Sequence, residues 1–302
     1  MSPDPPITLS AGALELRLSP SIGGSISGLD WIGGDQRVPV LRKCNSCHEN
    51  VLDAACFPLV PYVNRIRGGQ FTFRGRAVTL LPNMSGDVSP LHGQGWLSPW
   101  QVDRASASAA VLSFHHQPGE WPWEYRAEQH FALDENGLSL RLSCRNLSDE
   151  PMPCGLGQHP YFNCGGETRI DTQVTDVWTV DERVLPLHKI AATGRFDLAD
   201  RPVCSQDLDH SFGGWSGVAR MTDPAWPFDL ALSSPDARFF QLYSPLHSAA
   251  SGGIFVAEPV THANAALNAP ENQWLELGMR VLDPGEEMRL DMRLEVIARG
   301  SG

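Results

Sequence analysis

The segment DPGEEMRLDMRLEV, residues 283–296, contains the pattern from which the fold class follows. Its apolar residues fall at alternate positions: Leu290, Met292, Leu294 and Val296. This is the period of a strand with one buried face, and the preceding Asp-Pro-Gly supplies turn chemistry. The same alternation recurs at residues 14–18 and 138–142, so the chain is predicted to be mainly β.

Turn residues separate these predicted strands. Arg74-Gly75 lies between two apolar-alternating runs, and Asn136-Gly137 follows another, as in antiparallel hairpins. The chain has 28 Gly and 24 Pro, which leave room for short helical turns only. So many strands must pack face to face, and the sequence therefore predicts an all-β fold built as a large antiparallel β-sandwich.

The composition and charge of the chain limit how many domains it can form and which partners it can bind. No shift in composition marks a boundary, so residues 1–302 are predicted to form a single domain, acting as a monomer or homodimer. The net charge is -12 and no basic run could follow a phosphate backbone, so we expect no nucleic-acid partner. The first ten residues do not resemble a signal peptide, and no segment approaches the ~20 apolar residues of a membrane span. A cytoplasmic protein without membrane association is expected.

Seven cysteines are spread along the chain, an odd number that suits a reducing compartment better than a disulfide framework. Cys44, Cys47 and His48 spell C-x-x-C-H, the attachment pattern of c-type haem. Zinc binding by these three residues, with Cys56 as a fourth ligand, is the other cofactor interpretation. A lone CxxC is a weak metal signal, and the sequence favours a loop that holds no metal or cofactor.

Three potential proton carriers occur in distinctive surroundings: His92 in LHGQGW, His159 in GQHPYFN and Glu258 in VAEPVTHANAALN. Two histidines and a carboxylate are the groups that general acid-base catalysis on an uncharged polar substrate needs near neutral pH. Such a site requires no metal, no cofactor and no nucleophile. Each histidine alone could equally be a hydrogen-bonded core residue, so the interpretation depends on the three together.

The segment PLVPYVNRIRGGQFTFRGR, residues 58–76, adds a candidate binding residue. Arg65 lies between Asn64 and Ile66 after an apolar approach, which indicates partial burial. A partly buried guanidinium needs an acceptor, and a sugar hydroxyl or ring oxygen would serve.

The chain resembles the aldose 1-epimerase (galactose mutarotase) family in five motifs. The match runs in order through PYVNRIRGGQFTF, LHGQGW, QHPYFN, DLDHSF and AEPVTHANAALN. The HPYF and HGQGWLSPW stretches are closer to uncharacterised bacterial branches than to galactose-type members. The resemblance implies the galactose mutarotase-like supersandwich and cofactor-free interconversion of the α and β anomers of a free monosaccharide.

Carried over by position, the resemblance implies a role for each motif residue. Glu258 looks like the base that takes the C1 hydroxyl proton, and His159 looks like the acid that protonates the ring oxygen. His92 is similar to the second catalytic histidine. The residues that resemble the substrate-binding set are Arg65, Asn64 and, in DLDHSF, Asp209.

An aromatic wall for the sugar is also expected, because C–H faces of sugars pack on rings. Four aromatic residues lie in or beside the motifs: Trp96, Tyr161, Phe162 and Trp215. We expect at least half of them to be core residues rather than substrate contacts.

Two other functions stay open. A hexose-6-phosphate 1-epimerase would need a phosphate clamp, for which Arg67, Arg74 and Arg76 are the nearby candidates. A non-catalytic carbohydrate-binding protein could use the same fold, because a fold does not fix a function. Retention of both histidines and the glutamate favours the enzyme.

Overall fold

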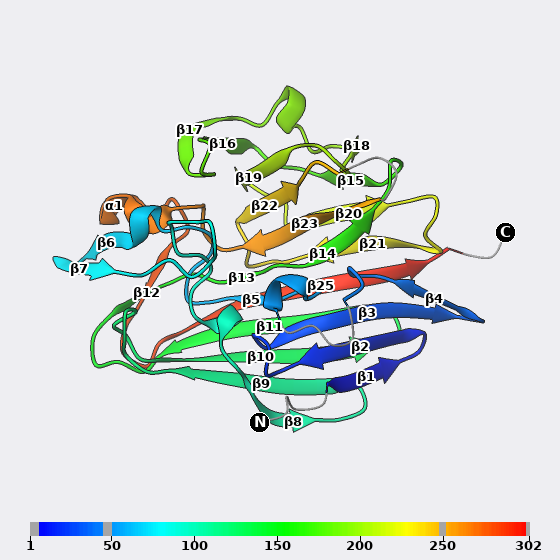
Figure 1. Ribbon diagram of the computed structural model, residues 1–302, viewed down its shortest axis with the longest axis horizontal. Coiled ribbons are helices and arrows are strands. Elements are labelled where there is room, and N and C mark those ends of the chain that lie inside the picture. Colours follow the sequence, from blue (N-terminus) through cyan, green and yellow to red (C-terminus); the bar gives the residue numbers. More distant parts are fainter. Residues whose placement is uncertain (1–5, 45–49, 248–251, 300–302) are drawn as a thin grey trace.

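Two large sheets dominate the computed structural model, which describes residues 6–44, 50–247 and 252–299 (Figure 1). The first sheet has nine strands in the order β18-β15-β20-β21-β25-β11-β10-β9-β8. In that order the strands are Arg201–Pro202, Arg169–Thr172, Val218–Thr222, Phe228–Ser233, Glu287–Ala298, Gly137–Asn146, Tyr125–Asp134, Ala109–His116 and Gln101–Ala105.

The second sheet has eight strands, seven of them in the order β17-β16-β19-β22-β23-β13-β5. These are Pro186–Ala191, Asp176–Val180, Leu208–Gly213, Phe239–Ser244, Gly253–Val260, Gly157–Gln158 and Pro58–Leu59. The eighth, β14 (Tyr161–Cys164), also pairs with β23. All pairings between these strands are antiparallel.

Smaller elements complete the fold. The N-terminal sheet contains β1 (Ile7–Ala11), β2 (Leu14–Ser19), β3 (Ser25–Gly33) and β4 (Gln36–Pro39). Two-stranded ladders join β12 (Met152–Cys154) to β24 (Arg280–Leu282) and β6 (Gln70–Phe73) to β7 (Arg76–Thr79). The helical elements are the short 3₁₀ turns η1 (Val51–Asp53), η2 (Arg67–Gly69), η3 (Gly95–Leu97), η4 (Gly194–Phe196) and η5 (Ala266–Asn268), and the α-helix α1 (Glu271–Trp274).

The predicted strand pattern is confirmed in the centre of the nine-stranded sheet. Every second residue of β25 from Met288 to Val296 is buried. Its neighbour β11 forms the predicted hairpin with β10: Glu135 and Asn136 are the turn residues, and Gly137 is the first residue of β11, paired with Asp134. The hairpin expected at Arg74-Gly75 is the β6–β7 ladder. The short β-turns and helical turns agree with the high glycine and proline content.

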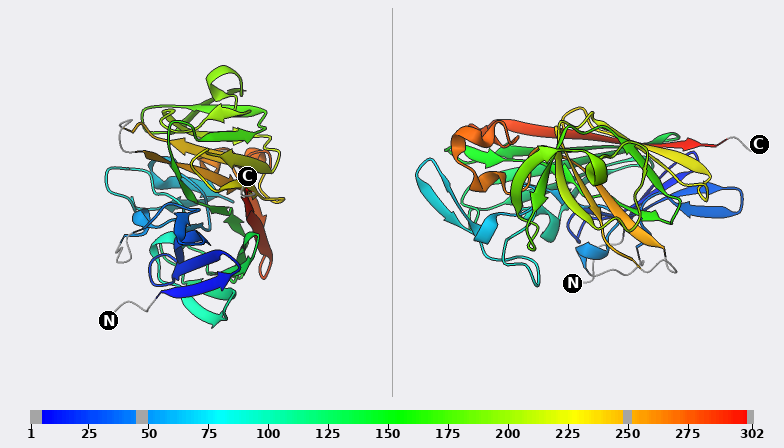
Figure 2. Two further views of the ribbon diagram at one scale, coloured as in Figure 1. Left: turned by 90° about the vertical axis from the view of Figure 1, so that its right-hand side faces the viewer. Right: turned by 90° about the horizontal axis from the view of Figure 1, so that it is seen from above.

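The sheets form two layers. Figure 2 shows the N-terminal and eight-stranded sheets on one side of the nine-stranded sheet. Large aromatic side chains fill the space between the layers, including the stacked pairs Phe162–Phe255 and Trp215–Phe240. The protein is therefore the all-β sandwich that the sequence predicts. No helix in the described part of the chain has the length and apolar character of a membrane span.

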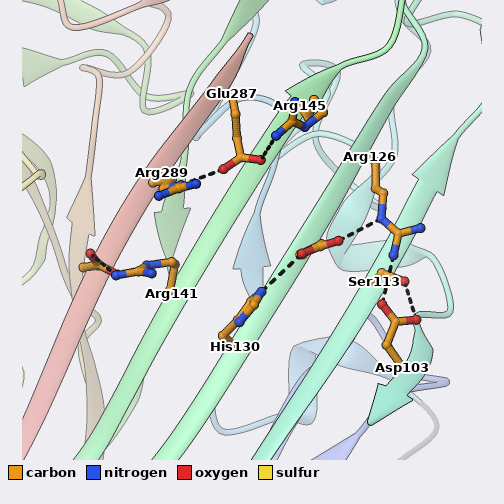
Figure 3. Close-up of polar contacts among 10 residues, drawn as sticks. Asp103, Ser113, Arg126, His130, Arg141, Arg145, Glu287 and Arg289 are labelled. Carbon is orange, nitrogen blue, oxygen red and sulfur yellow. Dashed lines mark hydrogen bonds and ion pairs between the residues drawn. The ribbon is translucent and has the colours of Figure 1, made fainter. Parts of the chain in front are cut away.

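The other face of the nine-stranded sheet is polar and carries ion pairs between strands (Figure 3). Arg141 on β11 contacts Asp291 on β25 through two N–H···O hydrogen bonds of 2.6 and 3.0 Å. Arg126 on β10 bridges to Asp103 on β8. A polar outer face and an apolar inner face are what an antiparallel sheet at a protein surface requires.

Candidate active site

All six predicted site residues line one cavity of about 240 Å³. They come from segments far apart in the sequence: Asn64, Arg65, His92, His159, Asp209 and Glu258. The strands β19, β22 and β23 form one wall, and the loops that contain His92 and His159 form the other. The cavity is thus built on the eight-stranded sheet, with loops covering it.

Glu258 and His159 lie together at the buried end of the cavity. Glu258 is on β23 opposite Gln241 of β22, and its side chain is 3% exposed. His159 lies between β13 and β14, where its N–H donates to the Phe57 carbonyl and its ring stacks on Phe57 at 4.4 Å between centroids. His159 Nε2 is 3.5 Å from Glu258 Oε1. Two further buried atoms, His159 Nδ1 and Glu258 Oε2, have no hydrogen-bond partner in the described part of the chain.

Burial shifts the pKa values of this pair in opposite directions. It raises the pKa of Glu258 well above the usual range, and the Asp209 charge adds to the increase while Arg65 opposes it. Burial lowers the pKa of His159 to about 3, with a further contribution from the Arg42 charge. Both shifts disfavour the charged form, as expected for groups removed from water. Burial therefore favours a protonated Glu258 beside a neutral His159.

His92 is fixed in one tautomer by the backbone. Its Nδ1 accepts a hydrogen bond from the Asn64 N–H at 3.1 Å, and the His92 N–H donates to the Asn64 carbonyl. Burial lowers the pKa of His92 well below its usual value, so the ring is neutral. A neutral ring that accepts at Nδ1 carries its proton on Nε2. Nε2–H is therefore the donor that His92 can offer in the cavity.

Glycine is required beside His92. Gly93 has φ of +75°, and a Cβ there would lie 2.1 Å from the Val60 carbonyl oxygen. This close approach brings the LHGQGW loop against the strand that leads to Arg65. Asn64 and His92 also have positive φ, of 58° and 59°.

Arg65 lies at the side of the cavity with most of its hydrogen bonds already made. Its Nε donates to Asp87 Oδ2 at 2.8 Å and its Nη1 donates to Asn64 Oδ1 at 3.1 Å. The side chain is 12% exposed, and Nη2 has no hydrogen-bond partner among the described residues. Arg65 can therefore offer Nη2 to a ligand.

The motif THANAALN, residues 261–268, has a function that the sequence did not reveal: it holds the Arg65 segment in place. Three of its side chains accept backbone N–H groups from alternate residues of that segment. The bonds are Val63 N–H to His262 Nε2, Arg65 N–H to Asn264 Oδ1 and Arg67 N–H to Asn268 Oδ1, at 2.8, 3.1 and 2.7 Å. We call these three residues the Asn/His clamp. His262 is thus a buried structural histidine, and its pKa is lowered by burial to about 4.

Asp209 is oriented by a hydrogen-bond chain across the sheet. Ser211 donates to Gln241 Oε1 at 2.8 Å, and Gln241 Nε2 donates to Asp209 Oδ1 at 2.9 Å. Burial raises the pKa of Asp209, while Arg65 opposes the increase. Gln241 lines the cavity but was not predicted, although a glutamine inside the apolar run FFQLYS was an available signal.

Two of the four predicted aromatic residues line the cavity. Trp96 and Tyr161 do so, whereas Phe162 and Trp215 are core residues between the sheets. This matches the expectation that at least half would be core. The guanidinium of Arg42 lies over the Tyr161 ring, 3.6 Å from its centre. Sequence reasoning missed five lining residues with apolar or aromatic side chains that the pattern does not distinguish from core: Leu52, Phe57, Met84, Leu91 and Tyr243.

The structure does not bring the proposed phosphate clamp into the cavity. Arg67 donates from Nη2 to the Pro186 carbonyl at 3.1 Å. Arg74 lies over Phe73, and Arg76 pairs with Glu150 at 2.6 Å on the surface. Arg65 is the one guanidinium among the cavity-lining residues that the structure describes.

The cysteine cluster lies largely outside the described residues, because Cys47 and His48 fall within residues 45–49. Cys44 and Cys56 are buried. Among the residues that the structure describes, no three His, Cys, Asp or Glu side chains are arranged to hold a metal ion. The absence of a cofactor stays a prediction.

The family assignment follows from comparison with known proteins. A family model described as aldose 1-epimerase matches residues 6–295. The chain belongs to the aldose 1-epimerase family. The resemblance predicted from the sequence motifs is therefore confirmed.

Two relatives of this family member come from Escherichia coli K12. The uncharacterized protein YphB is 32% identical over 296 residues, which cover 96% of this chain and 98% of YphB. The aldose 1-epimerase of that organism is 27% identical over 162 residues, which cover 49% of this chain and 45% of the enzyme. A crystal structure from the same strain, provisionally assigned as an aldose 1-epimerase, has a TM-score of 0.88 and 32% identity, covering 97% of this chain and 99% of that one.

Proposed function

We propose that this protein is a mutarotase that interconverts the α and β anomers of a free aldose by opening and closing the sugar ring. The observation that carries the proposal is the contact between His159 and Glu258, a proton donor and acceptor 3.5 Å apart in a buried cavity. Membership of the aldose 1-epimerase family supports it. Mutarotation needs only proton transfer, and each positioned acid or base contributes on the order of 100- to 10,000-fold.

In the proposed ring opening, Glu258 takes the proton of the C1 hydroxyl and the C1–O5 bond breaks. The electron pair of that bond goes to O5, which receives a proton from His159. The open aldehyde rotates about the C1–C2 bond. On closure at the opposite face the O5 hydroxyl gives its proton back to His159, and Glu258 gives its proton to O1, so no proton is gained or lost in the cycle.

The pKa shifts of the pair are compatible with this exchange. Protonated Glu258 with neutral His159 has the same number of protons as ionised Glu258 with protonated His159. A sugar that hydrogen-bonds the carboxylate can therefore bring the pair into its reactive form without exchanging a proton with solvent. Such a coupled pair titrates as a unit.

The remaining cavity residues would bind and orient the sugar. We assign His92 Nε2–H to the ring or anomeric oxygen, because Nδ1 already accepts from the backbone. Arg65 Nη2, Asn64 and Asp209 would bind ring hydroxyls, and Trp96 and Tyr161 would pack against C–H groups.

A neutral sugar suits the charges of the cavity better than a phosphorylated one. Asp209 and Glu258 line it, and the charge of Arg65 is already paired with Asp87. A phosphate dianion would find no unpaired cation among the described lining residues, and it would be repelled wherever Asp209 is ionised. We therefore propose an uncharged aldose as the substrate, and a hexose 6-phosphate as a poor one.

The test is polarimetry on freshly dissolved α-anomers of glucose, galactose, xylose, arabinose and fucose. Wild type should accelerate mutarotation of at least one sugar, and Glu258→Gln should lower kcat by roughly 100- to 10,000-fold. His159→Asn should have an effect of similar size. The matched controls are the exposed residues Glu276 and His188, whose Gln and Asn variants should retain full activity.

The other outcomes separate the alternatives. A fully active Glu258→Gln variant would rule out the assigned base. Activity on glucose 6-phosphate alone would indicate the phosphate-specific enzyme. Binding of a sugar by calorimetry without acceleration of mutarotation would indicate a carbohydrate-binding protein.

A further inference from the structure

The loop of residues 83–91 is a fixed structure beside the cavity. Asn83 closes it by accepting from the Leu91 N–H and donating to the Leu91 carbonyl, at 2.8 and 2.7 Å. Within it, Asp87 Oδ1 accepts the Ser89 N–H at 2.8 Å, and Ser89 Oγ accepts the Gly68 N–H. The Asp87 carboxylate is thus held by its own loop and is 13% exposed.

Asp87 uses its second oxygen to hold Arg65. Oδ2 accepts from Arg65 Nε at 2.8 Å, while Nη1 donates to Asn64 Oδ1. Because the guanidinium is planar, these two contacts fix its plane and leave Nη2 without a partner among the described residues. The backbone of Arg65 is fixed separately by Asn264. The side-chain orientation therefore depends on Asp87 and Asn64.

We propose that Asp87 is a positioning residue of the active site: it fixes the Arg65 guanidinium with Nη2 toward the substrate and offsets its charge next to the two buried carboxyl groups. This inference rests on the proposed mutarotase function. Asp87 does not line the cavity, so it would act through Arg65 rather than on the sugar.

The charges of Arg65 and Asp87 influence the titratable groups around the cavity. Besides Arg65 and Asp87, the titratable groups around the cavity are His92, His159, Tyr161, Asp209, Tyr243 and Glu258. Arg42 and Cys56 lie behind them. Arg65 lowers the pKa values of Asp209 and Glu258, whereas Asp87 raises that of Asp209. Removing the Asp87 charge should therefore lower the pKa of Asp209.

Two substitutions separate the two effects. Asp87→Asn keeps a carbonyl oxygen that can accept from Arg65 Nε but removes the charge. Asp87→Ala removes both. The matched control is Asp291→Asn, which removes the charge of an aspartate that pairs with Arg141 on the outer face of the nine-stranded sheet and does not line the cavity.

Steady-state kinetics with the best sugar and an infrared titration of the protonated carboxyl bands would be measured for each variant, with Asp209→Asn identifying the Asp209 band. We expect Asp87→Ala to raise KM by roughly 10- to 100-fold with a smaller change in kcat, since a misplaced binding group costs up to about 100-fold. Asp87→Asn should recover most of that KM, and its Asp209 band should disappear at a lower pH than in wild type. Asp291→Asn should match wild type in every measurement.

Several results would overturn the proposal. Wild-type KM in Asp87→Ala would show that Arg65 is oriented without Asp87. An equal loss of kcat in Asp87→Asn and Asp87→Ala, with no shift of the carboxyl band, would indicate a structural defect. If wild type itself catalyses no mutarotation, the proposed function fails, but the infrared titration still tests the charge relation between Asp87 and Asp209.

Discussion

Glu258 illustrates the conflict between stability and function at a single residue. Its carboxyl group is buried, one oxygen has no hydrogen-bond partner in the described chain, and its pKa is raised well above the usual range by burial. Ionisation therefore costs more in the folded protein than in the unfolded chain. A residue kept in this state is more easily explained by proton transfer than by its contribution to the fold.

A stability prediction follows for Glu258→Gln. Below about pH 4 the carboxyl group is neutral in both states, so the variant should match wild type. As pH rises, the unfolded chain releases this proton first, which destabilises wild type but not the variant. We expect thermal scans to give a higher Tm for Glu258→Gln at pH 8, by roughly 2–4 °C for each kcal/mol gained.

The control for that experiment is Glu276→Gln, which changes an exposed glutamate. Its Tm should follow wild type at every pH, because surface substitutions usually change stability by less than about 0.5 kcal/mol. A Glu258→Gln variant that is less stable than wild type at pH 8 would contradict the predicted cost of burying the carboxylate.

The pH dependence of activity is predicted by the shared proton of the pair. Catalysis requires that His159 and Glu258 hold a single titratable proton between them. Burial lowers the pKa of His159 to about 3 and raises that of Glu258, so this state should dominate across a broad interval that includes weakly acidic pH. The value of kcat/KM, measured by NMR exchange between anomers, should be flat there and fall as rising pH removes the proton. A fall toward acid between pH 7 and 5 would contradict it.

The sequence predicted six of the polar residues that line the cavity because each belongs to a distinctive motif. Their roles are still predictions that the variants above test. Gln241 and Tyr243 were missed because they alternate along β22 (Phe239–Ser244) with apolar neighbours, so the pattern looks like a core strand. Which face of such a strand borders a cavity depends on its pairing with β19 and β23, which is not local in sequence.

At the scale of elements, the Asn/His clamp is the means by which the loop of residues 261–268 fixes the backbone of the Arg65 segment. Asn264 accepts the Arg65 N–H and donates from Nδ2 to the Val184 carbonyl at 2.7 Å. Val184 has φ of 59°, an unfavourable region for a β-branched residue. The same side chain thus holds both the Arg65 segment and a strained turn beside β17.

Asn264→Ala should weaken the fold and the site together. It leaves the Arg65 N–H and the Val184 carbonyl without partners, which costs about 1–3 kcal/mol for a buried group. Urea denaturation should show this loss, and initial rates should show a higher KM because Arg65 moves. Asn264→Asp keeps the acceptor for Arg65 and should lie between wild type and Asn264→Ala.

The control for the clamp is Asn272→Ala, which removes an exposed asparagine of α1. It should leave both stability and KM unchanged. If Asn264→Ala also leaves both unchanged, the Arg65 segment is held by its other contacts.

The existence of the strands was predictable from alternation. The role of THANAALN in holding the Arg65 segment was not, since its hydrogen-bond partners lie about 200 positions away.

At the scale of the molecule, sandwich packing was predictable and strand order was not. Alternation identifies β25 as half-buried, but its position between β21 and β11 joins the end of the chain to two distant segments. Long-range pairing of this kind depends on the packing of the whole core. It also assembles the cavity, because β19, β22 and β23 reach it from different parts of the chain.

The net charge of the protein predicts how its activity depends on ionic strength. The protein carries a net charge of -12, and Asp209 lines the cavity. A neutral sugar should have a kcat/KM that is insensitive to ionic strength. For glucose 6-phosphate we expect a lower kcat/KM that rises as salt is added, because screening weakens the repulsion of the dianion. Coupled assays between about 10 and 300 mM salt measure this, and a rate on the phosphate that falls with salt would reveal a basic clamp instead.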